Sequence, residues 1–185
     1  MKGMDAGPSI RRFFINTLFD SIFMLLGVVV GSAFVLKPEL KVILGTMILS
    51  SLALGISSGV SVYEAETLER EREIQKLEKA MLTSLEDTEV TRSARKAAIV
   101  VASVNLATPL LVCTICTVPF TLVYLGTVGI KTAARTSIAI ALGALMFAGM
   151  YMGRYGKGNA ILKGVKMTAL GGITFLIIYL IGTLI

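Results

Sequence analysis

A mostly apolar run of 24 residues, Phe13–Leu36, limits the fold of this chain more than any other feature of the sequence. A helix of about 20 apolar residues crosses the hydrocarbon core of a bilayer, so this run is long enough to span a membrane. The chain is also 55% hydrophobic over its 185 residues, which is typical of a membrane protein rather than a water-soluble domain. We therefore predict an integral membrane protein.

Four further apolar runs follow the first. Pro38 is expected to end the first helix, and a polar stretch separates the second run from the third. The five predicted spans are residues 13–36, 42–63, 97–125, 132–153 and 165–185. We predict an all-α, polytopic fold with transmembrane helices 1 and 2 in residues 1–63, a short cytoplasmic helical insert in residues 64–96, and transmembrane helices 3 to 5 in residues 97–185. The first run is too long for a cleaved signal peptide and is expected to stay in the mature protein.

The distribution of Lys and Arg predicts the orientation, because these residues are more frequent on the cytoplasmic side of a membrane. With the N-terminus in the cytoplasm, 14 of the 18 basic residues fall in cytoplasmic segments and four fall outside. We therefore predict a cytoplasmic N-terminus and a cytoplasmic insert. The basic residues lie at helix ends, so the net charge of +6 does not indicate a nucleic-acid partner.

Asp20 is the main candidate for function. A charged side chain in the middle of a membrane helix costs about 2.5–3.5 kcal/mol on insertion scales, and it usually marks an ion or proton pathway. The alternative is a structural Asp that is hydrogen-bonded to another helix. Asn16, Thr17 and Met24 lie three or four residues away and are expected to share its face, so Asn16 and Met24 join Asp20 as path candidates.

The insert holds nine of the twelve acidic residues. Glu66, Glu69 and Glu73 have the spacing of one helical face, and converging carboxylates suit divalent cations. We expect Arg70 and Arg72 to point to other faces and leave these glutamates available. The alternative is a solvated helix whose acids pair with neighbouring Lys and Arg.

The second span is expected to run directly into the insert, because nothing between Val60 and Leu82 breaks a helix. Ser84 is the predicted N-cap of the returning helix, with Asp87 three residues later. Together with Asp87, Glu86 and Glu89 on this returning segment could complete a metal site.

The third span contains the motif Cys113–Thr–Ile–Cys116 between Pro109 and Pro119. The two thiols could bind a soft metal or take part in redox chemistry, or they could be ordinary buried residues. The prolines are expected to interrupt this helix, as in the broken helices that line transport sites. Asn105 and Thr108 are the other polar candidates in this region.

Small residues at four-residue spacing form a separate pattern: Gly27/Gly31, Gly55/Gly59 and Gly149/Gly153. Such pairs allow membrane helices to approach closely, within one chain or between chains. The chain contains no His, and it shows no pairing of a nucleophile with a base, so an enzyme is not expected.

Several stretches in order resemble one family of membrane proteins. They are Phe19-Asp20-Ser21 with the glycine-containing run 26–31, Val60-Ser61-Val62-Tyr63, Pro109-Leu110-Leu111 with Pro119, and Gly164–Met167 with Gly171-Gly172 and Tyr179–Gly182. With the acidic insert after the second span, this order resembles the vacuolar iron transporter family and its prokaryotic relatives. The resemblance covers nearly the whole chain.

The resemblance implies a homodimer in the cell membrane of a prokaryote, with a cation path between the two subunits near their first helices. It implies Asp20 as the transport carboxylate, a glutamate-lined metal-binding segment that includes Glu66, Glu69 and Glu73, and exchange of protons for metal. Fe(II) or Mn(II) would be the cargo, and no other cofactor is implied. We add Ser57 and Ser58 of the second span as path candidates.

The chain departs from the family in its second helix. The family carries a Met and a Gly-Glu pair just before the Val-Ser-Val stretch, and residues 54–59 here contain neither Met nor Glu. This difference motivates the alternative function, a membrane protein that senses metal or acts as a scaffold without transporting. The leading hypothesis is a divalent-cation transporter that moves metal out of the cytoplasm, with proton antiport as the expected coupling.

Overall fold

The computed structural model describes residues 7–35, 38–82, 85, 88–155 and 159–184. These residues form α1 (Gly7–Val30), which continues as the π-helical turn η1 (Gly31–Val35), α2 (Leu40–Met81), α3 (Glu89–Tyr124), α4 (Ile130–Tyr155) and α5 (Ala160–Leu184). Five helices among the described residues are long and apolar enough to cross a membrane. The predicted all-α, multi-pass membrane fold is confirmed.

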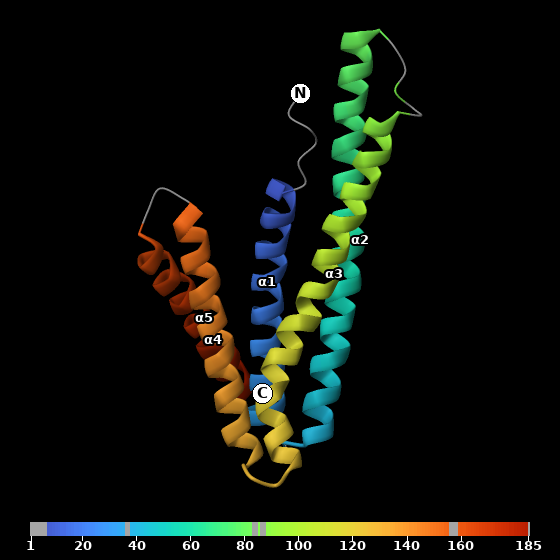
Figure 1. Cartoon of the computed structure of the whole chain (residues 1–185). Helices are drawn as coiled ribbons and strands as arrows, with labels where there is room; N and C mark the ends of the chain where they lie inside the picture. The colour runs from blue at the N-terminus through green and yellow to red at the C-terminus, as the bar shows by residue number, and fades with distance from the viewer. Residues whose placement is uncertain (1–6, 36–37, 83–84, 86–87, 156–158, 185) are drawn as a thin grey trace.

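Helix α2 is much longer than a membrane span. Its 42 residues extend over about 63 Å at 1.5 Å per residue. Its C-terminal end projects past the other helices together with the first turns of α3 (Figure 1). We call residues 64–82, 85 and 88–96 the arm. The uninterrupted passage from the second span into the arm agrees with the prediction.

The arm returns through a turn that differs from the prediction. Helix α3 begins at Glu89 with Thr88 as its N-cap residue, so the proposal that Ser84 caps this helix was wrong. Ser84, Glu86 and Asp87 lie outside the described residues. The carbonyl of Leu85 accepts hydrogen bonds from the hydroxyls of Thr88 and Thr91, at 2.8 and 2.6 Å. These side chains fix the chain where it enters α3.

Helix α3 is continuous through both prolines, so the prediction that they interrupt the third span was wrong. A proline has no N–H to donate, and Pro109 therefore leaves the carbonyl of Asn105 without its helical partner. The Ser58 hydroxyl of α2 shares its proton between that carbonyl, at 3.3 Å, and the carbonyl of Gly55 in its own helix, at 3.2 Å. A side chain of a neighbouring helix thus replaces the missing donor, and the helix passes the proline unbroken.

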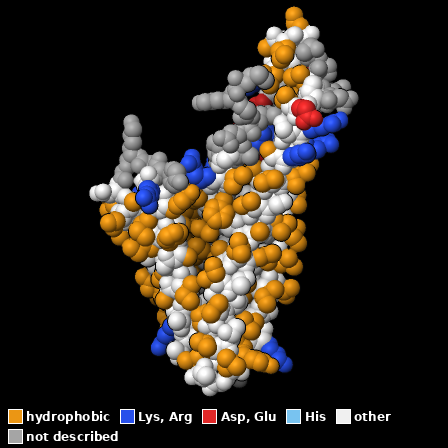
Figure 2. Space-filling model, viewed as in Figure 1, with side chains coloured by type: hydrophobic (Ala, Val, Ile, Leu, Met, Phe, Trp, Pro, Cys, Tyr) orange, Lys and Arg blue, Asp and Glu red, His pale blue; other side chains and the backbone are white. Residues whose placement is uncertain are grey.

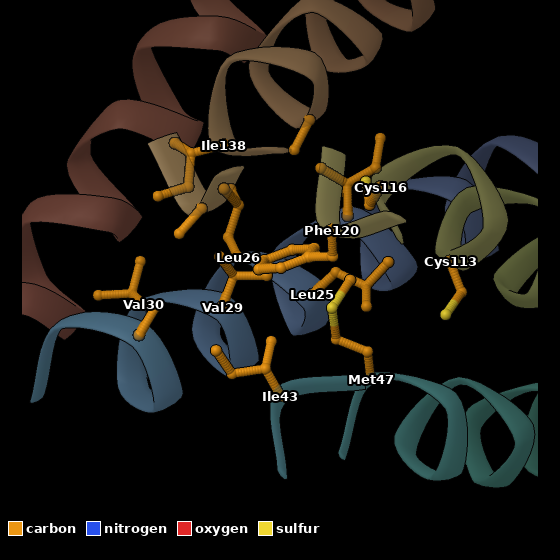
Figure 3. Packing of buried hydrophobic residues seen from close by; sticks show 14 of the residues in the cluster. Leu25, Leu26, Val29, Val30, Ile43, Met47, Cys113, Cys116, Phe120 and Ile138 are labelled. Atoms are coloured by element: carbon orange, nitrogen blue, oxygen red, sulfur yellow. The ribbon is translucent and has the colours of Figure 1, made fainter. Parts of the chain in front are cut away.

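The apolar core lies in the half of the molecule opposite the arm. It joins the second half of α1, the start of α2, the end of α3 and the first half of α4. Phe120 is fully buried among these helices, and Leu25, Leu26, Val29, Ile43 and Met47 surround it (Figure 3). Toward the arm, the α4–α5 hairpin leans away from the other three helices (Figure 1).

Two of the three glycine pairs bring helices together within the chain. A Cβ atom at Gly55 would lie 2.7 Å from the carbonyl oxygen of Leu106, and one at Gly153 would lie 2.4 Å from the Cα of Ala160. Close backbone approach of this kind is how helices pack in lipid, where burial of apolar surface gives no driving force. Around Gly31, in contrast, no atom of another helix in the described part of the chain lies within 4 Å of such a Cβ position.

The N-terminal end of α1, the arm, the end of α4 and the start of α5 lie at the same end of the molecule (Figure 1). Basic side chains gather at that end, and a smaller number lie at the opposite end, while the surface between them is largely hydrophobic (Figure 2). This arrangement is the one that the predicted spans require, with an apolar belt between two charged rims.

Candidate functional site

Asp20 lies near the middle of the first membrane span and is exposed in the single chain. The span begins at Ser9, so Asp20 lies about 16 Å along the helix axis from its start. Its Oδ2 atom accepts a hydrogen bond from Asn16 Nδ2 at 3.5 Å, and Asn16 is exposed as well. The structure therefore presents a carboxylate and an amide together on the outer surface of α1.

The other two expected neighbours of Asp20 are placed differently. Thr17 is buried, with 3% of its surface exposed, and faces α3 rather than sharing the exposed face of Asp20. The expectation that Thr17 shares the face of Asp20 was wrong for this reason. Met24 is half-buried and packs against the apolar core. Of the three expected neighbours, Asn16 is the one that hydrogen-bonds to the carboxylate.

Thr17 instead takes part in a buried polar contact that joins three helices. Its hydroxyl donates to Asn105 Oδ1 of α3 at 2.7 Å, and Asn105 Nδ2 donates to the carbonyl of Val101 at 2.8 Å. Ser58 of α2 reaches the backbone carbonyl of the same Asn105. We call Thr17, Asn105 and Ser58 the polar hub. The asparagine is completely buried, so its amide group is satisfied by protein alone.

The predicted path residues thus separate into two groups. Asn16 and Asp20 form an exposed pair on α1, and Ser58 belongs to the hub, where its hydroxyl is partly buried. Ser57 is exposed on α2 and is not part of the hub. Ser51 is fully buried one turn before Gly55, and its hydroxyl has no hydrogen-bond partner among the described residues.

Glu66 is placed differently from the other arm glutamates. It is 2% exposed, and its Oε1 atom accepts a hydrogen bond from Arg70 Nη2 at 2.6 Å, while Arg70 is 6% exposed. The prediction that Arg70 points away from the glutamates was wrong, because residues four apart meet on a helix and both of these face α3. One carboxylate oxygen of Glu66 is therefore occupied by a guanidinium group, while the other, Oε2, is buried without a hydrogen-bond partner among the described residues.

The remaining arm acids are spread out. Glu69 lies 3.7 Å from the guanidinium group of Arg12 on α1, both being well exposed, and Glu73 is exposed. Glu89 lies 4.0 Å from Arg92, and Glu86 is outside the described residues. Over the part of the chain that the structure describes, no three His, Cys, Asp or Glu side chains come close enough to hold a metal ion.

The two cysteines are free thiols inside the apolar core. Cys113 and Cys116 are 5% and 2% exposed, and their side chains lie at the edge of the cluster around Phe120 (Figure 3). The hydroxyl of Ser137 on α4 donates to the carbonyl of Cys116 at 2.7 Å. That contact ties α3 to α4 just before Pro119 through the backbone of the cysteine.

Comparison with known proteins gives one distant relative. No protein-family model matches the chain. A protein of Methanocaldococcus jannaschii, described as uncharacterized, is 27% identical over 166 residues, which cover 88% of this chain and 83% of the relative. The similarity extends over most of both sequences, and the relative's description gives no activity.

Proposed function

We propose that the protein is a transporter of divalent cations, Fe(II) or Mn(II), which moves the metal out of the cytoplasm with Asp20 as the carboxylate of the path. The observation that supports this most directly is the exposure of Asp20 within a membrane span. A carboxylate that faces lipid at this depth is costly, so protein or water must cover it in the membrane.

A second copy of the chain is the cover that we propose. Asn16 and Asp20 are exposed on the same helix as Gly31, where an added Cβ atom would have no atom of another described helix within 4 Å. Two such helices facing each other would bring two carboxylates and two amides together. Carboxylate and amide oxygens are suitable ligands for divalent cations. A metal that binds carboxylates displaces the protons they hold, so we propose proton exchange as the coupling.

The arm would act as a cytoplasmic collector of cations. We assign this role to the exposed Glu69 and Glu73 rather than to Glu66, because Glu66 is buried against Arg70. Exposed carboxylates at a path entrance raise the local concentration of cations through their electrostatic field. With the N-terminus in the cytoplasm of a prokaryotic cell, which the basic residues favour, the arm lies at the cytoplasmic entrance.

Metal flux into liposomes tests the transport proposal. The purified protein is reconstituted around a metal-quenched dye, and Mn(II), Fe(II) and Co(II) are added under pH gradients of both signs. We expect flux with the wild type and loss of flux at all metal concentrations in Asp20→Asn. In Glu73→Gln, flux should be slower at low metal concentration and unchanged at saturating metal. Both variants replace one carboxylate by its amide, so each controls for the other. Absence of flux for every metal would refute the proposal.

The alternative is a membrane protein that senses metal or serves as a scaffold through its arm. The pairing of Glu66 with Arg70 favours it, because this pairing makes the arm a folded unit rather than an open set of metal ligands. Overproduction in cells under metal stress separates the two functions. Metal resistance that Asp20→Ala leaves unchanged would support the alternative and contradict transport through Asp20.

A further inference from the structure

A cavity of about 90 Å³ lies between α2 and α3 at the base of the arm. Its wall combines charged and hydroxyl side chains with small apolar ones, and the polar members are Tyr63, Thr67, Arg70, Glu71, Thr91 and Arg95. A volume of this size has room for about three water molecules or for a small polar group. None of these residues belongs to the Asp20 site.

Two buried groups in this wall have unused hydrogen-bonding capacity. Arg70 donates to Glu66 through Nη2, but its Nε has no partner among the described residues, and neither does the hydroxyl of Thr67. Leaving a buried donor unsatisfied costs about 1–3 kcal/mol, so native proteins rarely keep such groups without a ligand or water. The cavity beside them supplies the space for one.

The cavity lies at the level where the helices leave the membrane. Its wall extends along α2 from Tyr63, the last residue of the apolar part, to Ile74 in the arm. Ile74 follows Tyr63 by eleven positions, or about 16 Å of helix, which covers the headgroup layer of a bilayer. Basic side chains gather at the same height (Figure 2), and basic pockets between membrane helices on this rim are typical lipid-headgroup sites.

The charges around the cavity are balanced. Arg70 and Arg95 contribute two positive groups to its wall, Glu71 contributes one negative group, and Glu66 pairs with Arg70 behind the wall. A purely anionic ligand would be repelled by the carboxylate of Glu71 and would carry no positive group to pair with it. A ligand with both a phosphate and an amino group would satisfy the guanidinium groups and the carboxylate together.

We propose that this cavity binds the headgroup of an amino-bearing phospholipid such as phosphatidylethanolamine. The phosphate accepts hydrogen bonds from Arg70 Nε, Thr67 and Arg95, and the ammonium group pairs with Glu71. The acyl chains leave the cavity past Tyr63 and Ala98 toward the hydrocarbon region. This proposal does not depend on the transport activity of the protein.

Native mass spectrometry of the full chain, released from detergent with added dioleoyl phosphatidylethanolamine or dioleoyl phosphatidylglycerol, tests the proposal. We expect the ethanolamine lipid to bind more tightly. Arg95→Gln should weaken binding of both lipids about tenfold, as expected for loss of a charge-assisted hydrogen bond. Arg92→Gln, one turn away on α3 and outside the cavity wall, removes the same charge and should leave binding unchanged. Glu71→Gln should abolish the preference for the ethanolamine lipid, whereas Glu89→Gln should keep it.

Three results would overturn the proposal. Equal losses in Arg95→Gln and Arg92→Gln would mean that lipids respond only to the general positive charge of this rim. Tighter binding of the glycerol lipid by the wild type would contradict the pairing of an ammonium group with Glu71. Displacement of the bound lipid by an equal concentration of inorganic phosphate would show that the cavity is a site for soluble phosphate.

Discussion

Replacing Arg70 by Met should unfold the arm while leaving the membrane helices intact. The substitution keeps an unbranched apolar stem but removes the guanidinium group that neutralises Glu66. Glu66 is 2% exposed, so its carboxylate would stay buried without a partner unless the arm opened. Breaking a buried ion pair by removal of one member costs about 3–5 kcal/mol.

The apolar contacts of the arm are too few to offset this loss of stability. The buried apolar cluster of the arm consists of Ile74, Leu85 and Ala94. Burial of one large aliphatic side chain contributes about 1.5–3 kcal/mol, so the two large members contribute about as much as the broken pair removes. Local opening is then far less costly than global unfolding. A loss of about 3 kcal/mol raises the opening equilibrium roughly 100-fold.

Hydrogen exchange measured by mass spectrometry on peptides of the arm would detect this change. Exchange of arm amides in Arg70→Met should be faster by about two orders of magnitude, and peptides of α4 and α5 should be unaffected. The double variant Glu66→Gln/Arg70→Met removes both charges and should recover most of the protection. Arg92→Met, which breaks an exposed pair, should change exchange little. Unchanged protection of the arm in Arg70→Met would refute the reasoning.

Three further variants test the packing of the membrane helices. Thr17→Val removes the hydroxyl that donates a hydrogen bond to Asn105 Oδ1, and it should lower the free energy of unfolding in mixed micelles by about 0.6–1.7 kcal/mol. No measurable change would mean that the polar hub does not contribute to stability. Gly55→Ala should destabilise the chain because its Cβ would lie 2.7 Å from a backbone oxygen of α3, whereas Gly45→Ala has open space and should be neutral in the same assay. Gly31→Leu should leave the single chain folded and reduce the dimer fraction in membrane cross-linking; an unchanged dimer fraction would exclude this part of the first span from the interface.

The number and order of the membrane helices could be predicted from sequence because lipid imposes a simple rule. A backbone in hydrocarbon must satisfy its own hydrogen bonds, so each long apolar run becomes a helix. The extension of α2 into the arm was also predictable, since no Gly or Pro interrupts residues 60–82. Capping at Ser84 could not be judged in this way, because hydrogen bonds from the hydroxyls of Thr88 and Thr91 to the carbonyl of Leu85 hold the start of α3.

The effect of Pro109 was predicted incorrectly because the sequence does not show which donor replaces a missing N–H. Ser58 supplies it from a residue 47 positions earlier in the chain. The pairing of Glu66 with Arg70 was missed for a similar reason. Spacing alone allows Glu66 to face either a metal or a neighbouring residue, and its burial against α3 decides for the latter. The available signal was the four-residue spacing of a Glu and an Arg on a long helix, at the base of the arm.

Because α2 is one unbroken helix, its part in the arm and its part in the membrane move together as a rigid body. Ser58 of the polar hub and Met81 at the tip of the arm belong to one helix and are separated by 23 residues, or about 35 Å. A tilt of about 5° around the hub would therefore displace the tip by roughly 3 Å, with no hinge along the helix to absorb it. Conversely, a force at the tip would be delivered to the contact between Ser58 and Asn105, and from there to the helix that carries Asp20. Events outside the membrane can thus reach the first span as rigid-body motion.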